Sequence, residues 1–500
     1  MINMPVILLL LTAIIVLISA ASCAMDARQS AALTHRTKID LTPCLLASYA
    51  TKVLCGKLEV FEGGVALMGR KIALHMVVLP ALVAEAAPDP VFFLAGGPGQ
   101  GAAKIAAAGE DSLMSQLRRR RDLVFIDQRG TGSSQPLDCN LSADPGLLQS
   151  YFDELFPVEK VRACRAALQR IRDLELYTTP IAVSDLDEAR VALGYDKINL
   201  YGISYGTLMA LQYLRRYPNN VRVVTLAGVT TPAAKLPLHY AKGAQHALDK
   251  LFQDCAGEDI CRSVYPNLKA DFAKVLAKLD EAPATFAVPH PETKEPQIVK
   301  LSRNVFAERL RMMLYNISTA SLVPLIIDRA AREDWTAFAR AVTRAPISSR
   351  YAPAMGMYLT VSCSESLPSI SEDEISRETG GTFTGEYRIR AHQEACREWP
   401  QADIPADYFA AVNSPAPVLM LSGELDSATP AHLGAEAAKT LSNSRQIVLP
   451  ATAHDYTSAC VGSIVVQFIT TASTAGLNTG CVERLRRPPF PIELPARHLR

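Results

Sequence analysis

Short apolar runs recur through the first half of the chain, and each is followed by small or polar residues. Continuous apolar runs of four to seven residues are typical of strands buried on both faces, as in a parallel sheet. Helical patterns of apolar residues separate several of these runs, so the alternation predicts an α/β fold with a mostly parallel central sheet. The runs expected to be strands are residues 91–94, 123–126, 198–200 and 221–226. The helical patterns cover residues 155–175 and 185–193.

Two earlier segments alternate apolar and polar residues, which is typical of strands with one exposed face. They cover residues 55–60 and 71–79 and are separated by Gly63-Gly64, so we expect an antiparallel hairpin. Buried strands return near the end of the chain, at residues 417–421 and 446–449, before a helix at about residues 458–472.

The middle of the chain lacks this alternation of strand and helix. Amphipathic helical patterns dominate it. We expect a helical cap over residues 232–407 that is inserted into the sheet domain and covers the carboxyl ends of its strands. The sheet domain is then formed by residues 40–231 and 408–500, and the second part carries an acid and a base. The clearest helical patterns are residues 305–314, 322–331 and 335–342.

Residues 1–24 predict a secretory signal peptide. Residues 5–18 form a continuous apolar run that is short for a membrane span, and small residues suited to cleavage follow it. The segment before Cys23 loosely resembles a bacterial lipoprotein box, so a lipid anchor at Cys23 is an alternative outcome. We expect an exported protein, periplasmic or extracellular, without a stable membrane span after cleavage.

The cysteine content agrees with export. Ten of the eleven cysteines follow Cys23, and an even number in an exported chain indicates disulfides. Neighbouring cysteines pair naturally along the sequence, most persuasively Cys255 with Cys261, but the sequence leaves both the connectivity and the alternative of buried thiols open. Cysteine and histidine do not occur at metal-ligand spacing, so we expect neither a metal nor another cofactor. The net charge of +1 gives no reason to expect a nucleic-acid partner.

The strand expected near residue 200 leads into Gly202-Ile203-Ser204-Tyr205-Gly206, and a helical pattern follows. Strand, sharp turn and helix are the context of a nucleophile elbow, with Ser204 as the nucleophile. Small residues must flank a serine in such a strained turn, and Gly202 and Gly206 meet that need.

A second glycine-rich loop, at residues 95–101, follows the strand at 91–94. It matches neither the dinucleotide-binding nor the Walker pattern of glycines. We therefore expect an oxyanion hole, with the backbone N–H groups of Gly97 and Tyr205 as donors, rather than a plain tight turn. Asp127 and Arg129 follow the next strand, and we interpret them as a salt-bridged loop that braces the glycine loop.

The acid and the base are expected after the last two strands. Asp426 follows the strand at 417–421, and His454 follows the strand at 446–449. A serine hydroxyl needs an imidazole to take its proton, and the imidazole needs a carboxylate to fix its tautomer. Ser204, Asp426 and His454 occur in the order nucleophile, acid, base, and each lies at the carboxyl end of a predicted strand. Glu424 and Asp455 are the nearest alternative acids.

Several motifs together resemble the proline iminopeptidase and tripeptidyl aminopeptidase branch of the α/β-hydrolases, including a C-terminal region like that of the tripeptidyl aminopeptidases. The resemblance covers roughly residues 50–230 and 415–460. It implies an α/β-hydrolase fold with a helical cap, the triad of Ser204, Asp426 and His454, and a secreted serine exopeptidase that releases residues from peptide N-termini. The motifs are Cys55-Gly-Lys-Leu-Glu-Val, Leu94-Ala-Gly-Gly-Pro-Gly, Asp127-Gln-Arg-Gly-Thr-Gly, Gly202-Ile-Ser-Tyr-Gly-Thr, Ser422-Gly-Glu-Leu-Asp and the late His454.

Two features bear on the substrate. Ala95 stands where proline iminopeptidases often have histidine, which leaves the triad intact but argues against a strict proline iminopeptidase. The resemblance also implies an anion in the cap that binds the α-ammonium group of a peptide, and Glu365 is the candidate. A carboxylesterase or lipase on the same scaffold is the main alternative, because esters and amides share the acyl-enzyme route. A binding protein without activity is a third hypothesis.

Overall fold

The computed structural model describes most of the chain. The predicted signal peptide and Cys23 lie outside the described residues. The described residues are 39–46, 53–64, 69–109, 111–139, 141, 144, 146–290, 293–344 and 352–494.

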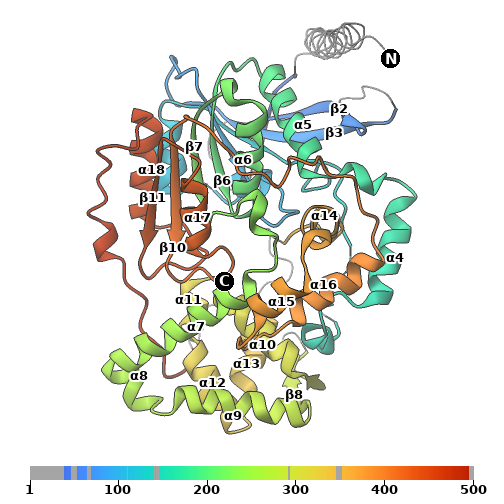
Figure 1. The fold of residues 1–500 in the computed structure, drawn as a ribbon, viewed down its shortest axis with the longest axis vertical. Coiled ribbons are helices and arrows are strands. Elements are labelled where there is room, and N and C mark those ends of the chain that lie inside the picture. Colours follow the sequence, from blue (N-terminus) through green and yellow to red (C-terminus); the bar gives the residue numbers. More distant parts are fainter. Residues whose placement is uncertain are drawn as a thin grey trace, which may run out of the picture.

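One sheet of nine strands runs through the described chain, in the order β1-β2-β3-β5-β4-β6-β7-β10-β11 (Figure 1). The strands from β5 to β11 in this order are parallel, and β1, β2 and β3 add an antiparallel edge. This confirms the predicted mostly parallel sheet, and the pairing of β2 with β3 confirms the predicted hairpin. The strands are β1 (Thr42–Cys44), β2 (Val53–Phe61), β3 (Lys71–Leu79), β4 (Val91–Leu94), β5 (Leu123–Ile126), β6 (Ile198–Ile203), β7 (Val221–Ala227), β10 (Val418–Gly423) and β11 (Ser444–Leu449).

The sheet is buried on both faces because side chains of its central strands alternate between two apolar cores. In β4, Phe92 and Leu94 belong to one core, and Val91 and Phe93 belong to the other. The first core contains side chains of α5 and α6, and the second contains those of α3 and α18. Continuous apolar strands therefore follow from helices on both sides of the sheet. The helices around the sheet are α2 (Ala103–Ala107), α3 (Ser112–Arg118), α4 (Val158–Gln169), α5 (Thr179–Ala192), α6 (Tyr205–Arg216), α17 (Ala431–Ala438) and α18 (Ala459–Thr471).

Between β7 and β10 the chain is mainly helical, and most of this segment lies below the sheet in Figure 1. Helices α10, α12 and α13 coincide with the three clearest patterns of the predicted cap. An antiparallel hairpin of β8 (Ala284–Pro289) and β9 (Pro296–Leu301) was not expected, because alternate residues in both strands are exposed and the apolar signal is weak. The helices are α7 (Tyr240–Gly257), α8 (Asp259–Val264), α9 (Leu268–Glu281), α10 (Arg303–Met313), α11 (Ile317–Ala320), α12 (Val323–Ala331), α13 (Thr336–Arg344), α14 (Met355–Val361), α15 (Glu372–Thr379) and α16 (Tyr387–Arg397).

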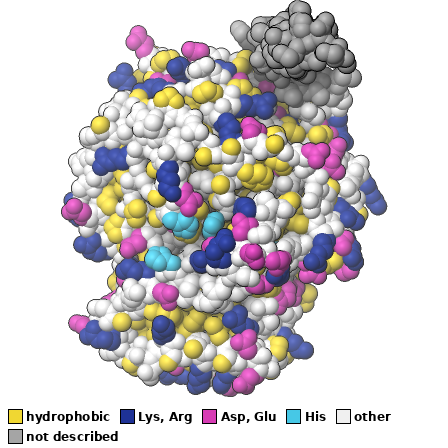
Figure 2. Space-filling model, in the orientation of Figure 1, with side chains coloured by type: hydrophobic (Ala, Val, Ile, Leu, Met, Phe, Trp, Pro, Cys, Tyr) yellow, Lys and Arg dark blue, Asp and Glu magenta, His cyan; other side chains and the backbone are white. Residues whose placement is uncertain are grey.

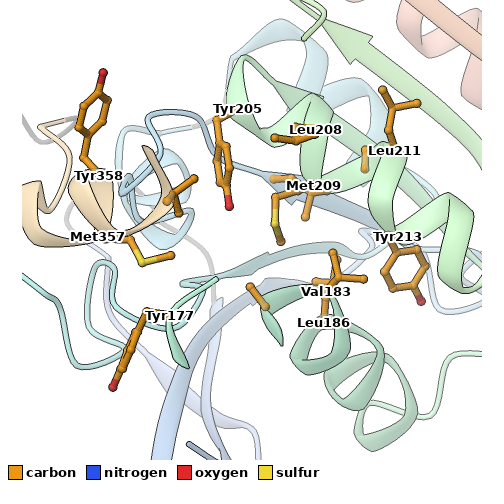
Figure 3. Close-up of a cluster of buried hydrophobic side chains, with 14 of the residues drawn as sticks. Tyr177, Val183, Leu186, Tyr205, Leu208, Met209, Leu211, Tyr213, Met357 and Tyr358 are labelled. Carbon is orange, nitrogen blue, oxygen red and sulfur yellow. The ribbon is translucent and has the colours of Figure 1, made fainter. Parts of the chain in front are cut away.

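The inserted segment packs as two parts. Side chains of α7 to α13 share a separate apolar core with Leu148, Tyr151 and Phe152, which precede β6, and with Phe490 near the end of the chain. Side chains of α14 to α16 instead join the core that covers α5 and α6. Figure 3 shows this second part, where Met357 and Tyr358 of α14 lie in the same cluster as Tyr205 and Met209 of α6. The second part of the predicted cap is therefore continuous with the sheet domain.

Five disulfides join the ten described cysteines, and each links neighbours in the sequence. This confirms the disulfides and gives the pairing that the sequence left open. The pairs are Cys44–Cys55, Cys139–Cys164, Cys255–Cys261, Cys363–Cys396 and Cys460–Cys481. Within the described residues, no helix combines the length and apolar character that crossing a bilayer requires. On the face drawn in Figure 2, acidic and basic side chains are interspersed, in keeping with the small net charge.

Candidate active site

Ser204 occupies the sharp turn between β6 and α6. Its backbone has φ 56° and ψ −124°, a conformation that costs energy for a residue with a side chain. The Ser204 N–H donates to the carbonyl of Ala227 at 2.9 Å, and the Ser204 carbonyl accepts from Thr207 N–H at 2.8 Å. A Cβ at Gly206 would overlap the last carbonyl of β4, and one at Gly202 would overlap the carbonyl of Gly206. The two glycines are thus required by the close approach of β6, α6 and β4.

His454 and Asp426 form a hydrogen-bonded pair on the loops after β11 and β10. The Nδ1 of His454 lies 2.7 Å from Oδ2 of Asp426, so the ring donates to the carboxylate. The Oδ1 of Asp426 accepts the backbone N–H groups of Ala428 and Thr429, both at 2.8 Å. Its Oδ2 also accepts the hydroxyls of Thr429 and Tyr456, both at 2.7 Å. This set of donors holds the buried carboxylate in one orientation.

The pair carries opposite pKa shifts. Burial alone would raise the pKa of Asp426, but His454 and the surrounding donors hold it below its usual value. Burial alone would lower the pKa of His454, but the Asp426 carboxylate raises it above its usual value. The competing acid Asp455 points elsewhere, since its carboxylate accepts the N–H groups of Ile317 at 3.3 Å and Ala453 at 3.2 Å. Asp426 is therefore the carboxylate that orients the imidazole.

Three residues around this pair were not found from the sequence. Thr429 and Tyr456 donate to Asp426, and a Cβ at Gly228 would come within 3.0 Å of Cε1 of His454. Thr429 and Tyr456 could have been found from the sequence, because each lies within three residues of Asp426 or His454. Gly228 follows the end of β7, and neither its position nor its neighbours pointed to His454.

Ser204 and His454 line the same cavity, which has a volume of about 600 Å³. Gly97 also lines it, so the structure brings three of the predicted residues to one space. Gly97 has φ 110° and lies where a side chain would crowd the backbone N of Gly99 at 2.7 Å. The side chain of Tyr205 is buried, and its hydroxyl lies 2.6 Å from Oγ1 of Thr179. The Tyr205 side chain therefore points away from the cavity-lining residues of the elbow, and only its backbone can act there.

Asp127 and Arg129 have structural contacts, as the sequence suggested. Asp127 accepts the N–H of Ala103, at the start of α2 directly after the glycine loop, at 2.8 Å. Arg129 is fully buried and forms a bidentate ion pair with Asp185 of α5, at 2.6 and 2.7 Å. The two residues brace the glycine loop and attach it to the helix behind it.

The expectation for Glu365 needs correction. Glu365 lies in a π-helical turn (Ser362–Ser366) and is not among the described residues that line the cavity. Its carboxylate accepts the N–H and the hydroxyl of Thr179, at 2.6 and 2.7 Å, and the hydroxyl of Tyr408 at 2.5 Å. Burial raises the pKa of Glu365 to about 7. Protein donors occupy this carboxylate, so it cannot also bind a substrate amine.

The inserted segment supplies a charged part of the cavity wall. Glu308, Arg309 and Arg388 line the cavity together with Tyr240 and other residues. Glu308 binds Arg388 and also Arg311, whose Nη2 lies 2.6 Å away. Although burial favours its protonated form, these arginines hold the pKa of Glu308 at about 2. Groups of three or more histidine, cysteine, aspartate or glutamate side chains placed to hold a metal ion are absent from the described part of the chain.

The strand order, the sharp turn at Ser204 and the hydrogen-bonded pair of Asp426 and His454 are those of an α/β-hydrolase. The sequence matches the family described as the alpha/beta hydrolase fold over residues 89–456. The chain belongs to this family and is an enzyme of the serine hydrolase type.

Three similar proteins carry the names of proteases or peptidases. Serine protease Hip1 of Mycobacterium tuberculosis (strain ATCC 25618 / H37Rv) is 27% identical over 488 residues, which cover 89% of this chain and 91% of that protein. A tripeptidyl aminopeptidase of Streptomyces lividans is 30% identical over 155 residues, 28% of each chain. The crystal structure of a proline iminopeptidase from Mycobacterium smegmatis covers 83% of this chain and 98% of its own, with 15% identity and a TM-score of 0.40. The resemblance predicted from the motifs is confirmed.

Proposed function

We propose that this protein is an exported aminopeptidase that releases proline or short peptides from peptide N-termini through an acyl-enzyme. Ser204 is the nucleophile, His454 the general base and Asp426 the acid that orients it. Gly97 and Tyr205 donate their backbone N–H groups to the oxyanion. The observation that carries the proposal is the 2.7 Å contact between His454 and Asp426 beside a cavity that Ser204 also lines.

The chemistry follows from these positions. Imidazole takes the Ser204 proton as the hydroxyl attacks the scissile carbonyl, and Asp426 stabilises the imidazolium that forms. The oxyanion develops near the N-terminus of α6, where N–H groups and the helix dipole favour negative charge. His454 then protonates the leaving amine. Water hydrolyses the acyl-enzyme by the same route, with His454 again as base.

A substrate amine needs a carboxylate inside the cavity. Glu365 is bound by Thr179 and Tyr408, and Glu308 is bound by two arginines. We assign the α-ammonium site to Asp153, which lines the cavity and accepts a long hydrogen bond, of 3.4 Å, from Nε2 of Gln149. Asp153→Asn should raise KM for free-amine peptides about tenfold and leave N-acetylated peptides unchanged, a loss of about 1.4 kcal/mol of binding. An equal effect on both kinds of peptide would remove this role from Asp153.

Loss of the nucleophile tests the mechanism. Ser204→Ala should abolish turnover and labelling by a fluorophosphonate probe, with unchanged thermal unfolding. Ser463→Ala is the control, because it removes a hydroxyl on α18 that binds the carbonyl of Cys460. Labelling that persists in Ser204→Ala, or that disappears in the control, would contradict the assignment.

Substrate class needs a separate comparison. Aminoacyl, prolyl and tripeptidyl fluorogenic amides with free amines should be cleaved with higher kcat/KM than short acyl esters of matched size. A preference for the esters would instead indicate a carboxylesterase or lipase.

Export and the fate of Cys23 are tested by mass spectrometry of the mature N-terminus from a host with both processing routes. A mature protein that retains residues 1–24 would contradict export.

A further inference from the structure

The charged part of the cavity wall contains more cations than its ion pairs neutralise. Arg309 of α10 and Arg388 of α16 line the cavity, and Arg311, which is not among the lining residues, binds the same Glu308 carboxylate as Arg388. Both oxygens of Glu308 are bound by Arg311, and one is shared with Arg388. Asp153 and Glu154 also line the cavity, but among the described residues neither forms an ion pair with Arg309 or Arg388, so this part of the wall favours a guest that brings negative charge.

Arg388 retains an unused donor. One of its nitrogens binds Glu308 and another donates to the hydroxyl of Tyr358 at 3.0 Å. Its Nε is buried and has no hydrogen-bond partner among the described residues. A buried N–H of a cation without an acceptor is costly, because it has lost water and gained nothing in return. The unpaired N–H leaves part of the positive charge of Arg388 uncompensated beside the cavity that this residue lines.

Arg309 is the second cation with spare donors. Its Nε donates to the carbonyl of Tyr151 at 3.1 Å, and within the described chain no carboxylate forms an ion pair with it. Burial lowers the pKa of Arg309, and the neighbouring charge of Arg388 lowers it further, although Glu308 and Asp153 act in the opposite direction. Two guanidinium groups that repel each other across one wall are stabilised by an anion between them.

We propose that Arg309 and Arg388 form a subsite that binds a carboxylate on the acyl part of the substrate. Resting on the proposed aminopeptidase function, the ligand is an aspartate or glutamate side chain in the segment on the amino side of the scissile bond. A planar guanidinium binds a carboxylate through two parallel hydrogen bonds, which neutral amides cannot match. Asp153, which would hold the α-ammonium group of the same peptide, lies near enough to Arg309 to act on its pKa, so the two charged groups of the peptide would bind at neighbouring positions.

The other reading of this wall is an amine site at Glu308. Its carboxylate already accepts three guanidinium contacts, and the local charge remains positive after they are made. An ammonium group would meet Arg309 and Arg388 at short range and would be repelled. The same geometry that excludes a cation here therefore favours an anion.

Paired substrates test the subsite by turnover. Tripeptidyl coumarin amides that carry glutamate at one position are compared with the same peptides carrying glutamine, at every position in turn. At one position the glutamate peptide should have the higher kcat/KM, by about tenfold or more, as expected for a charge-assisted hydrogen-bonded pair of about 1.5–3 kcal/mol. Arg388→Met and Arg309→Met should each reduce this ratio at least about threefold, mainly through KM.

Controls separate the subsite from general electrostatics and from misfolding. Lys160→Met removes another positive charge that lines the cavity and should leave the ratio unchanged. Arg388→Met also frees Glu308 and can unfold the wall, so Arg309→Met, which leaves the ion pairs of Glu308 intact, keeps the test decisive. A wild-type ratio near one at every position, or a ratio that both arginine variants leave unchanged, would overturn the proposal.

Binding to Ser204→Ala gives a readout that does not depend on turnover. Glutaramate carries one carboxylate, and glutaramide has the same chain length with none. Calorimetry should show tighter binding of glutaramate, and Arg309→Met should remove the difference. If no free-amine peptide is cleaved but this difference is found, the aminopeptidase proposal fails and the anion subsite stands. If peptides are cleaved and the difference is absent, the subsite fails alone.

Discussion

Glu365→Gln should stabilise the folded protein relative to the wild type, and this difference should grow as the pH rises. Glu365 is buried, its oxygens accept donors from Thr179 and Tyr408, and the described residues supply it with no cation. Burial raises its pKa from 4.5 to about 7. Glutamine has nearly the same shape. Its oxygen can accept the Thr179 N–H, and its NH₂ can donate to the hydroxyls of Thr179 and Tyr408. The Thr179 hydroxyl can then donate to the hydroxyl of Tyr205 instead.

The magnitude follows from linkage. Below about pH 4.5 the carboxyl group is protonated in both states. As the pH rises towards 7, the unfolded chain loses this proton while the folded chain keeps it, so the free energy of unfolding falls. The gap between 4.5 and about 7 corresponds to about 3 kcal/mol, at about 1.4 kcal/mol per pH unit. The Glu365→Gln variant has no such titration. Relative to the wild type it should gain about 3 kcal/mol between about pH 4.5 and pH 8.

Equilibrium unfolding in guanidinium chloride measures this difference, with disulfides intact and ionic strength held constant. All other titrating groups are common to both proteins, so the difference between them isolates Glu365. Glu394→Gln removes an exposed glutamate of α16 and should show no comparable gain. A stability difference between Glu365→Gln and wild type that stays constant over this range, or that falls with pH, would refute the reasoning.

Three further substitutions test the contacts that position the site. Tyr456→Phe removes one donor from Asp426 and should lower kcat about tenfold with little change in KM, measured by steady-state kinetics, since hydrogen bonds to charged groups contribute about 1.5–3 kcal/mol. Gly206→Ala places a methyl group against the end of β4 and should abolish activity and destabilise the fold by about 1–3 kcal/mol; full activity in a well-folded protein would contradict the packing. Arg129→Met leaves Asp185 buried without a partner and should cost about 3–5 kcal/mol in denaturant unfolding, whereas adding Asp185→Asn should recover part of the loss.

The sheet and the contact between Asp426 and His454 were predictable because both depend on local patterns. A strand buried on two faces must be continuously apolar, and residues after parallel strands meet at one edge of the sheet. Ser204, Asp426 and His454 could therefore be chosen from their places after predicted strands. Tyr456 was missed although it stands two residues after His454, because tyrosine has no position-specific pattern and its partner Asp426 is 30 residues away in the sequence.

The inserted segment was less predictable because its contacts join distant parts of the chain. The contact between Glu365 and Thr179 spans 186 residues, and the contact between Arg388 and Glu308 spans 80. Amphipathic periodicity shows that a helix has a buried face, but it does not show which charged side chains meet across two helices. Glu365 was chosen from the sequence as the acidic residue of the cap, but its partners Thr179 and Tyr408 are far from it in the sequence.

Tyr315 contacts both His454 and the charged part of the cavity wall. The backbone N–H of His454 donates to the carbonyl of Tyr315 at 2.9 Å, and the two rings lie 5.3 Å apart edge to face. Arg311 donates to the hydroxyl of the same tyrosine at 3.0 Å and binds Glu308 in the charged wall. A guest that repositions this wall therefore acts on a residue in contact with the imidazole. Tyr315, in the loop after α10, therefore links the charged wall on α10 to the imidazole of His454.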